Sequence, residues 1–243
     1  MTDFIKRFTA NTQGRDFIVG DIHGSFSKLE HALEKIRFDA AHDRLFSVGD
    51  MVDRGPESPR VLDFLSQEWF HAVRGNHEAM CLDMAFGKYP ASHHVKNGGA
   101  WFASLSEAER VPYVDAFSNL PRVIEIEHSH GPIGIVHADC PMPSWPDFCA
   151  RLPDDPEIQY QSMWNRNRVE EFITDGVSDV RAVVVGHMPL SAPVILGNVY
   201  HIDTTAVSSR GHFTFLELGE TLQLHEPGRL RPESVFPSPL PGK

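Results

Sequence analysis

The stretch FIVGDIHG at residues 17–24 decides the fold, because a short apolar run ends abruptly at a glycine that is followed by Asp21 and His23. Such a run, bounded by a turn signal, is typical of a buried strand. The apolar residues that come next recur at the spacing of an amphipathic helix, with Ser25 or Ser27 as its N-cap: Leu29, Ala32, Leu33 and Ile36. The stretch therefore predicts a strand that leads through a polar turn into a helix.

The same unit is repeated downstream. The segment LFSV (45–48) stops at Gly49 and predicts a second strand. Apolar residues at Val61, Leu62 and Leu65 then predict a second helix, and FHAV (70–73) predicts a third strand. A β-α-β-α-β order predicts parallel strands that are joined by right-handed crossovers.

The remainder is read as a helical middle and a β-rich second half. Residues 77–120 have helical spacing, with Ser106 and Glu109 as a capping box. Six later segments have the pattern of strands: 122–127, 133–136, 182–185, 199–202, 213–217 and 221–224. Two packed sheets flanked by helices would bury both halves, so we expect a single α/β domain at residues 1–225. The five prolines of residues 226–243 predict an extended or disordered tail.

Five of the predicted strands are followed directly by groups that bind metal ions. These groups are two carboxylates, three imidazoles and one amide: Asp21, His23, Asp50, Asn76, His137 and His187. In open α/β sheets, ligands collect at the carboxyl ends of the strands. Nitrogen and oxygen donors without a thiolate suit Mn, Fe or Zn. Six donors exceed one tetrahedral site and favour two ions that share a carboxylate.

Eight motifs occur in a fixed order over residues 20–204 and carry a family resemblance. They are GDIHG (20–24), GDMVDRG (49–55), RGNHE (74–78), NGGAWF (97–102), HADCP (137–141), WNRNR (164–168), GHMP (186–189) and IDT (202–204). In these motifs the chain resembles the phosphoprotein phosphatases of the calcineurin-like metallophosphoesterase superfamily, most closely those of the phage lambda type. One position departs from that pattern, since Thr205 stands where a glycine is expected.

The resemblance implies a four-layer α/β/β/α sandwich in which two mixed sheets are flanked by helices. It also implies a dinuclear metal site in which Asp50 bridges both ions. The first ion would be held by Asp21 and His23, and the second by Asn76, His137 and His187. Mn²⁺ is the expected metal, with Fe or Zn as alternatives.

The resemblance further implies that His77 is the general acid and that Asp53 orients it. Arg54 and Arg166 would clamp the phosphate, and Asn76 would also reach a phosphate oxygen. The neighbouring Arg168 is a rival for the second clamp, but the position of Arg166 directly after Trp-Asn favours Arg166.

The expected reaction is hydrolysis of phosphoserine and phosphothreonine in a phosphorylated protein or peptide, with phosphotyrosine left open. Two cations neutralise the phosphate dianion and generate a bridging hydroxide that attacks phosphorus in line with the leaving oxygen. A serine or threonine alkoxide leaves poorly, so a proton donor contributes about 10²–10⁴-fold. A phosphocysteine route is unnecessary, because none of the three cysteines has an arginine six residues later.

Two other functions stay open. A symmetrical diadenosine tetraphosphate hydrolase would share the metal ligands and cleave a phosphoanhydride. The intact Asp53-Arg54-Gly55 and the glutamate Glu78 favour the phosphatase, because that relative usually changes both places. A non-catalytic regulatory module would be expected to have lost a ligand or the acid, and none is missing.

Composition excludes several classes. The 22 basic and 33 acidic residues give a formal net charge of −11, which argues against nucleic-acid binding and against docking on anionic membranes. Three cysteines are too few for a disulfide scaffold and indicate a reducing compartment, so we expect a cytoplasmic protein. Neither a signal peptide nor an 18-residue apolar stretch is visible.

A few further polar residues have two interpretations. Glu78 could support a ligand or only favour the start of a helix, and Asp139 could orient a ligand or cap a turn. The histidine pairs 93–94 and 128/130 lie in polar stretches, so we expect them to be solvated. Trp101 and Phe102 are expected to be packing residues beneath the site, and loops near 85–98 and 141–162 to shape the substrate groove.

Overall fold

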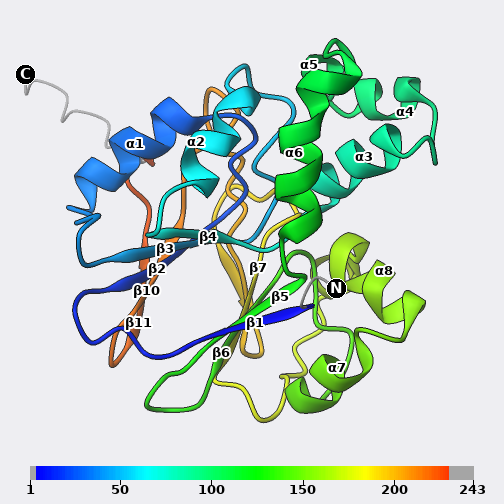
Figure 1. Cartoon of the computed structure of the whole chain (residues 1–243). Helices are drawn as coiled ribbons and strands as arrows, with labels where there is room; N and C mark the ends of the chain where they lie inside the picture. Colours follow the sequence, from blue (N-terminus) through cyan, green and yellow to red (C-terminus); the bar gives the residue numbers. More distant parts are fainter. Residues whose placement is uncertain (1–3, 230–243) are drawn as a thin grey trace, which may run out of the picture.

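The central strands are apolar on both faces. In β2 (Asp16–Val19), Phe17 belongs to one buried cluster and Ile18 to another. In β7 (Ala182–Val185), Val183 and Val184 are divided in the same way. Because successive side chains of a strand point to opposite faces, each sheet has to be covered on both sides. The computed structural model, which describes residues 4–229, achieves this with two sheets packed on each other between helices (Figure 1).

The first sheet contains the predicted β-α-β-α-β core. Its strand order is β11 (Leu222–His225), β10 (Phe215–Leu218), β2, β3 (Arg44–Ser47) and β4 (Phe70–Ala72). Strands β2, β3 and β4 pair in parallel, so the predicted parallel pairing is confirmed. Strand β10 pairs antiparallel with β2 and makes the sheet mixed.

The second sheet has the order β1 (Ile5–Phe8), β5 (Val123–Ile126), β6 (Ile133–Val136), β7, β9 (Val199–His201) and β8 (Val194–Leu196). It is also mixed, because β5 and β6 are antiparallel whereas β6 and β7 are parallel. The edge strands β1 and β8 were not predicted. Each is only three or four residues long with exposed side chains in it, so neither gives a buried apolar run.

Helices cover the outer faces. On the first sheet lie α1 (Phe26–Lys35), the 3₁₀ turn η1 (Ser58–Arg60) and α2 (Val61–Leu65), and Figure 1 shows α1 and α2 beside β3 and β4. The predicted helical middle is confirmed as α3 (Asn76–Ala85), α4 (Ala91–Lys96), α5 (Ala100–Ala103) and α6 (Glu107–Asn119). Helix α6 begins with the expected capping box of Ser106 and Glu109.

The segment that was expected to be a loop at 141–162 is largely helical. It contains α7 (Trp145–Arg151) and α8 (Pro156–Trp164), and α9 (Asn167–Glu170) follows. Pro146 and Pro156 lie in the first turns of α7 and α8, where the missing N–H is not needed. Ser144 and Asp155 cap these two helices with their side chains.

The four-layer prediction is therefore confirmed within the described residues. The predicted tail lies mostly outside them, since only residues 226–229 of it are described. Among residues 4–229, none of the helices has both the length and the apolar character that a membrane span requires.

The layer between the two sheets is apolar and contains Ile18, Phe46 and Leu216 from one side and Ile124, Ile135 and Val184 from the other. Phe46 is fully buried and meets the Phe8 ring edge-on at 5.1 Å between centroids. We expect Phe46→Ala to lower the free energy of unfolding by about 3–5 kcal/mol, because a cavity remains between the sheets. Urea denaturation measures this change.

The matched control is Phe86→Ala, because the Phe86 side chain is 59% exposed. That variant should stay within about 0.5 kcal/mol of the wild type. Equal losses in the two variants would contradict the view that the layer between the sheets is the main core.

Candidate metal centre and acid–base site

All six predicted metal ligands meet at one edge of the two-sheet sandwich. Each lies at or just beyond the end of a strand or at the first residue of a helix: Asp21 and His23 after β2, Asp50 after β3, Asn76 at the start of α3, His137 after β6 and His187 after β7. All six are buried. The structure thus brings together donors that are up to 166 residues apart in the chain.

The backbone at these strand ends is strained. Positive φ values occur at five non-glycine residues of the site: His23, Asp50, Asp53, Arg54 and His187. Left-handed conformations are uncommon for side chains with a Cβ and persist only where the surrounding structure enforces them. The turns therefore hold these side chains at orientations that a relaxed chain would not adopt.

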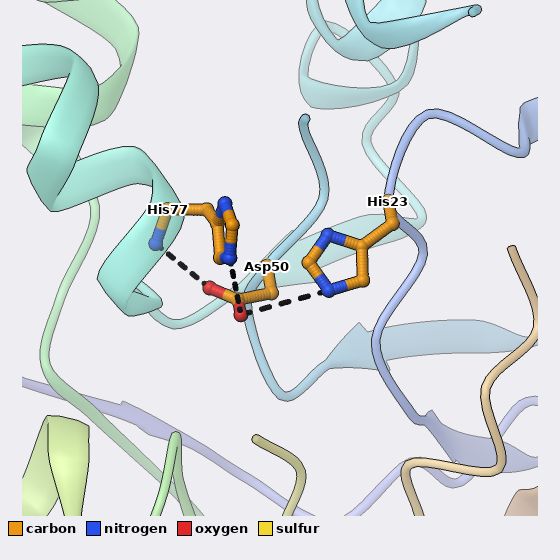
Figure 2. Close-up of side chains that lie close together, drawn as sticks. All are labelled: His23, Asp50 and His77. Carbon is orange, nitrogen blue, oxygen red and sulfur yellow. Dashed lines mark hydrogen bonds and ion pairs between the residues drawn. The ribbon is translucent and has the colours of Figure 1, made fainter. Parts of the chain in front are cut away.

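Asp50 lies at the centre of the site (Figure 2). Its Oδ2 faces His23 Nε2 and His77 Nε2, both at 3.8 Å, and its Oδ1 accepts the backbone N–H of His77 at 2.9 Å. His137 Nε2 approaches the same Oδ2 at 3.4 Å. Ligands at about 2.0–2.2 Å from one ion lie roughly 3–4 Å from one another, so this spacing suits a shared cation.

A second group of donors surrounds the amide of Asn76. Its Oδ1 lies 2.8 Å from His137 Nε2 and 2.9 Å from His187 Nδ1. The backbone N–H of His187 points at both carboxylate oxygens of Asp21, at 3.2 Å each. The two groups are therefore connected through Asp50 and Asp21.

Backbone carbonyls fix the tautomers of two ligand histidines. His23 Nδ1 donates to Val52 O at 2.9 Å, and His137 Nδ1 donates to Val48 O at 2.7 Å. In each ring the bare nitrogen is then Nε2, which is the atom that faces Asp50. The Nε2 of His23 is buried and has no hydrogen-bond partner among the described residues. An unpartnered, correctly oriented imidazole nitrogen is what a metal ligand requires.

The buried carboxylates of the site would be stabilised by bound cations. Burial, together with the carboxylates of Asp203 and Asp50, raises the pKa of Asp21 well above its usual value. Burial lowers the pKa of His23 and of His187 to about 3, so both rings are neutral donors. Buried carboxylates are costly unless they are paired. The oxygen and nitrogen donor set therefore fits divalent metal ions.

Glu78 supports the turn that carries Asp50. Its two carboxylate oxygens accept the backbone N–H groups of Gly75, Asp50 and Met51 at 2.8–3.0 Å, and that of Val52 at 3.3 Å. Both earlier interpretations hold, because Glu78 caps the start of α3 and also fixes the loop of a metal ligand. Burial and the nearby Asp50 raise the pKa of Glu78 to about 7.

His77, the predicted acid, follows the candidate ligand Asn76 in the chain, and its side chain is buried. Its Nδ1 lies 2.7 Å from Asp53 Oδ2, and its Nε2 lies 3.1 Å from the Arg54 guanidinium. Asp53 is also contacted by the indole N–H of Trp101 and by His94 Nε2, both at 2.7 Å. Trp101 is therefore more than a packing residue, whereas Phe102 is fully buried as expected.

The two arginines of the WNRNR motif have different environments. Arg166 is exposed, and its Nε lies 3.5 Å from His187 Nε2 at the opening of the site. Arg168 is buried and donates to Asp139 at 2.8 Å and to the carbonyl of Asp175 at 2.8 Å. Asp139 also accepts from Asn165 at 3.0 Å, so it fixes the segment that carries both arginines.

The environment of His94 differs from the expectation. The expectation that His94 is solvated is wrong, because only 1% of His94 is exposed, whereas His93 is exposed as predicted. The sequence next to the two histidines does not separate them, since both lie in a polar stretch. The one signal is the pair of glycines that follows, which allows another segment to approach closely.

Thr205 has a φ of 55°, which explains why glycine is expected at this position.

A groove of about 400 Å³ opens beside the metal ligands. It is lined by residues of α3, of α8 and of segment 85–98: Met80, Met84, Tyr89, His93, Tyr160 and Trp164. Tyr89, His93 and Tyr160 lie in the segments expected to shape the substrate groove, and that this cavity binds substrate stays a prediction. The Trp164 ring lies 6.1 Å from that of His187, so one wall of the groove is next to this candidate ligand. Tyr89 and Tyr160 are 58% and 61% exposed.

A two-sheet sandwich with imidazole, carboxylate and amide donors at its strand ends is the architecture of a metal-dependent phosphoesterase. A family model described as calcineurin-like phosphoesterase matches residues 17–217. The chain belongs to this family, which confirms the resemblance seen in the sequence motifs.

Three known proteins illustrate the relationship. Serine/threonine-protein phosphatase 1 of Salmonella typhimurium is 36% identical over 209 residues, which is 84% of this chain and 93% of that protein. A symmetrical bis(5'-nucleosyl)-tetraphosphatase of Coxiella burnetii is 35% identical, but over only 53% of this chain and 43% of its own length. A solved serine/threonine phosphatase from Saccharomyces cerevisiae has the same fold, with a TM-score of 0.66 over 96% of this chain and 86% of that one, at 16% identity.

We expect Glu78→Gln to weaken metal binding about 10- to 100-fold. A glutamine offers one acceptor oxygen, and its NH₂ group would face backbone N–H groups that now point at a carboxylate. The Asp50 turn would lose part of its support. Calorimetric titration of the metal-stripped protein with Mn²⁺ measures the affinity.

Glu107→Gln is the control, because Glu107 is exposed on α6 and distant from the metal ligands in the chain. It should bind Mn²⁺ as the wild type does. An unchanged Mn²⁺ affinity in Glu78→Gln would show that the turn keeps its shape without this carboxylate.

Proposed function

We propose that the protein is a protein phosphatase that hydrolyses phosphoserine and phosphothreonine monoesters with two divalent metal ions, most readily Mn²⁺. One observation carries the proposal: the six candidate donors converge, with Asp50 at their centre and His77 beside them. Two exposed arginines, Arg54 and Arg166, lie at the opening. These residues match a bound metal pair, a proton donor and a phosphate clamp.

In this proposal Asp21 and His23 hold one ion, Asn76, His137 and His187 hold the other, and Asp50 contacts both. When bound, the ions neutralise the phosphate dianion and lower the pKa of a coordinated water toward about 7. Arg54 and Arg166 bind the phosphate oxygens, because a guanidinium meets a phosphate with two parallel hydrogen bonds. Asn76 lies between the ligand histidines, where its amide can also reach a phosphate oxygen.

His77 is proposed to protonate the leaving alkoxide. Its Nδ1–H is directed to Asp53, and its Nε2 faces the guanidinium of Arg54. When Arg54 turns to the phosphate, His77 Nε2 is free to carry the proton that the leaving oxygen requires. Asp53 stabilises the imidazolium and keeps the ring in this orientation.

The groove beside the site favours a peptide substrate. Its exposed aromatic rings and methionines offer an apolar surface next to His187, where the residues that flank a phosphorylated side chain would lie. A dinucleotide tetraphosphate remains the alternative substrate, but the relative with that activity covers only about half of this chain. A cytoplasmic location is part of the proposal, because the three cysteines are free, buried thiols.

The proposal is tested by initial rates on a phosphothreonine peptide and on diadenosine tetraphosphate. Metal-stripped protein should be inactive, and added Mn²⁺ should restore hydrolysis of the peptide in preference to the dinucleotide. His77→Asn should lower kcat on the peptide by about 10²–10⁴-fold, because the alkoxide then leaves without a proton. Metal content of the variant should stay at the wild-type level.

Preference for the dinucleotide would show that the protein is a diadenosine tetraphosphate hydrolase, and the proposed metal ligands would be unaffected. Two bound metal ions without turnover of either substrate would support the non-catalytic module.

Arg166 and Arg168 should separate activity from stability. Arg166→Ala should lower kcat/KM for the peptide about 10- to 100-fold with little change in Tm, because charged hydrogen bonds to phosphate are lost. Arg168→Ala should lower the free energy of unfolding by about 3–5 kcal/mol, because it leaves the buried Asp139 unpaired. Kinetics and urea denaturation of both variants measure these effects. The reverse pattern would assign the clamp to Arg168.

A further inference from the structure

Asp53 is more heavily hydrogen-bonded than orientation of one histidine requires. Its Oδ1 accepts from Trp101 Nε1, and its Oδ2 lies 2.7 Å from both His77 Nδ1 and His94 Nε2. The proposed reaction uses His77 and Asp53 but assigns no role to His94. All three members of this His77–Asp53–His94 group are buried, with at most 1% of each exposed.

Close packing against two glycines holds His94 in this position. Its ring lies directly over Gly99, where a Cβ would collide with it. The preceding glycine, Gly98, accepts the backbone N–H of Arg54 at 3.4 Å. Helix α4 and the Asn-Gly-Gly turn thus pack against the segment that carries both Asp53 and Arg54. A solvated surface histidine would need none of these contacts.

We propose that His94 is a positioning residue for the acid: it shares Asp53 Oδ2 with His77 and thereby sets the strength of the His77–Asp53 hydrogen bond. This inference rests on the proposed role of His77. The second imidazole reaches the same carboxylate oxygen from α4, a helix that carries none of the candidate metal ligands.

The physical reason is competition for one oxygen. For both contacts to be hydrogen bonds, His77 presents Nδ1–H and His94 presents Nε2–H to an ionised Asp53. Each donor that a carboxylate oxygen accepts reduces what it offers to the other. His94 therefore keeps Asp53 in place while weakening its hydrogen bond to His77 Nδ1–H. A weaker bond at Nδ1 stabilises the imidazolium less, so the separate proton on Nε2 is given to a leaving group more readily.

A metal ion held by Asp53, Cys81 and His94 is the competing explanation, because the three side chains form a compact cluster. One feature argues against it: His94 Nε2 is in direct hydrogen-bond contact with Asp53, so in this arrangement the nitrogen carries a proton and is not a free metal donor.

The test compares two aryl phosphates that differ in their need for an acid. p-Nitrophenolate leaves without a proton, whereas phenolate, like a tyrosine side chain, is basic and benefits from one. His94→Phe should lower kcat on phenyl phosphate about tenfold more than on p-nitrophenyl phosphate, with unchanged metal content. His94→Gln should restore most of the loss, because its Nε2 is separated from Cβ by the same number of bonds. The exposed His31→Phe is the matched control and should behave as the wild type.

His77→Asn with His94→Phe should be no slower on phenyl phosphate than His77→Asn alone, since His94 acts only through the acid. An equal loss on both aryl phosphates would overturn the proposal and make His94 a structural residue. So would a third equivalent of metal that disappears in His94→Phe, or rates that stay at wild-type level. The aryl pair reports on the acid even if peptides prove not to be substrates, so failure of the proposed function is recognised separately.

Discussion

The carboxylate of Glu78 is the constraint on which the rest of the site depends. It accepts four backbone N–H groups, three from the turn after β3 and one from the turn after β4. That pairing holds Asp50 at a positive φ with its carboxylate directed at the imidazoles. Without such an anchor, a non-glycine residue would relax out of this conformation. One buried side chain thus connects the turns that follow β3 and β4 and fixes the orientation of Asp50, the central candidate ligand.

The close approach of neighbouring strand ends imposes a second requirement. Gly49 has a φ of 95° and lies against the backbone of Gly75 and the ring of His137, so no side chain fits there. A Cβ at Gly186 would collide with the carboxylate of Asp21. At Gly49 and Gly186, the glycine before the candidate ligand is therefore a packing requirement as well as a turn signal, and it allows side chains from two sheets to meet.

These two requirements explain how much could be predicted. Strand ends followed by Gly-Asp or Gly-His are local patterns, so the parallel core, the family resemblance and the convergence of the six candidate donors were accessible from sequence. The contact of His94 with Asp53 joins positions 41 residues apart through a helix and a turn whose packing no local pattern encodes. The short edge strands β1 and β8 were missed for a related reason, since their pairing depends on neighbours rather than on their own residues.

The charge balance of the site links metal binding to folding. Asp21, Asp50 and Asp203 are all buried, and the positive charge of Arg54 partly offsets the raised pKa of Asp21 and of Asp203. Burial and Asp50 raise the pKa of Asp203, which shows the unfavourable proximity of these carboxylates. Ions that bind the folded site and not the unfolded chain would relieve this repulsion and stabilise the fold by mass action. Asp203 is also tied to the strained backbone of Thr205, whose N–H donates to it, and Lys28 donates to three carbonyls of the loop that follows.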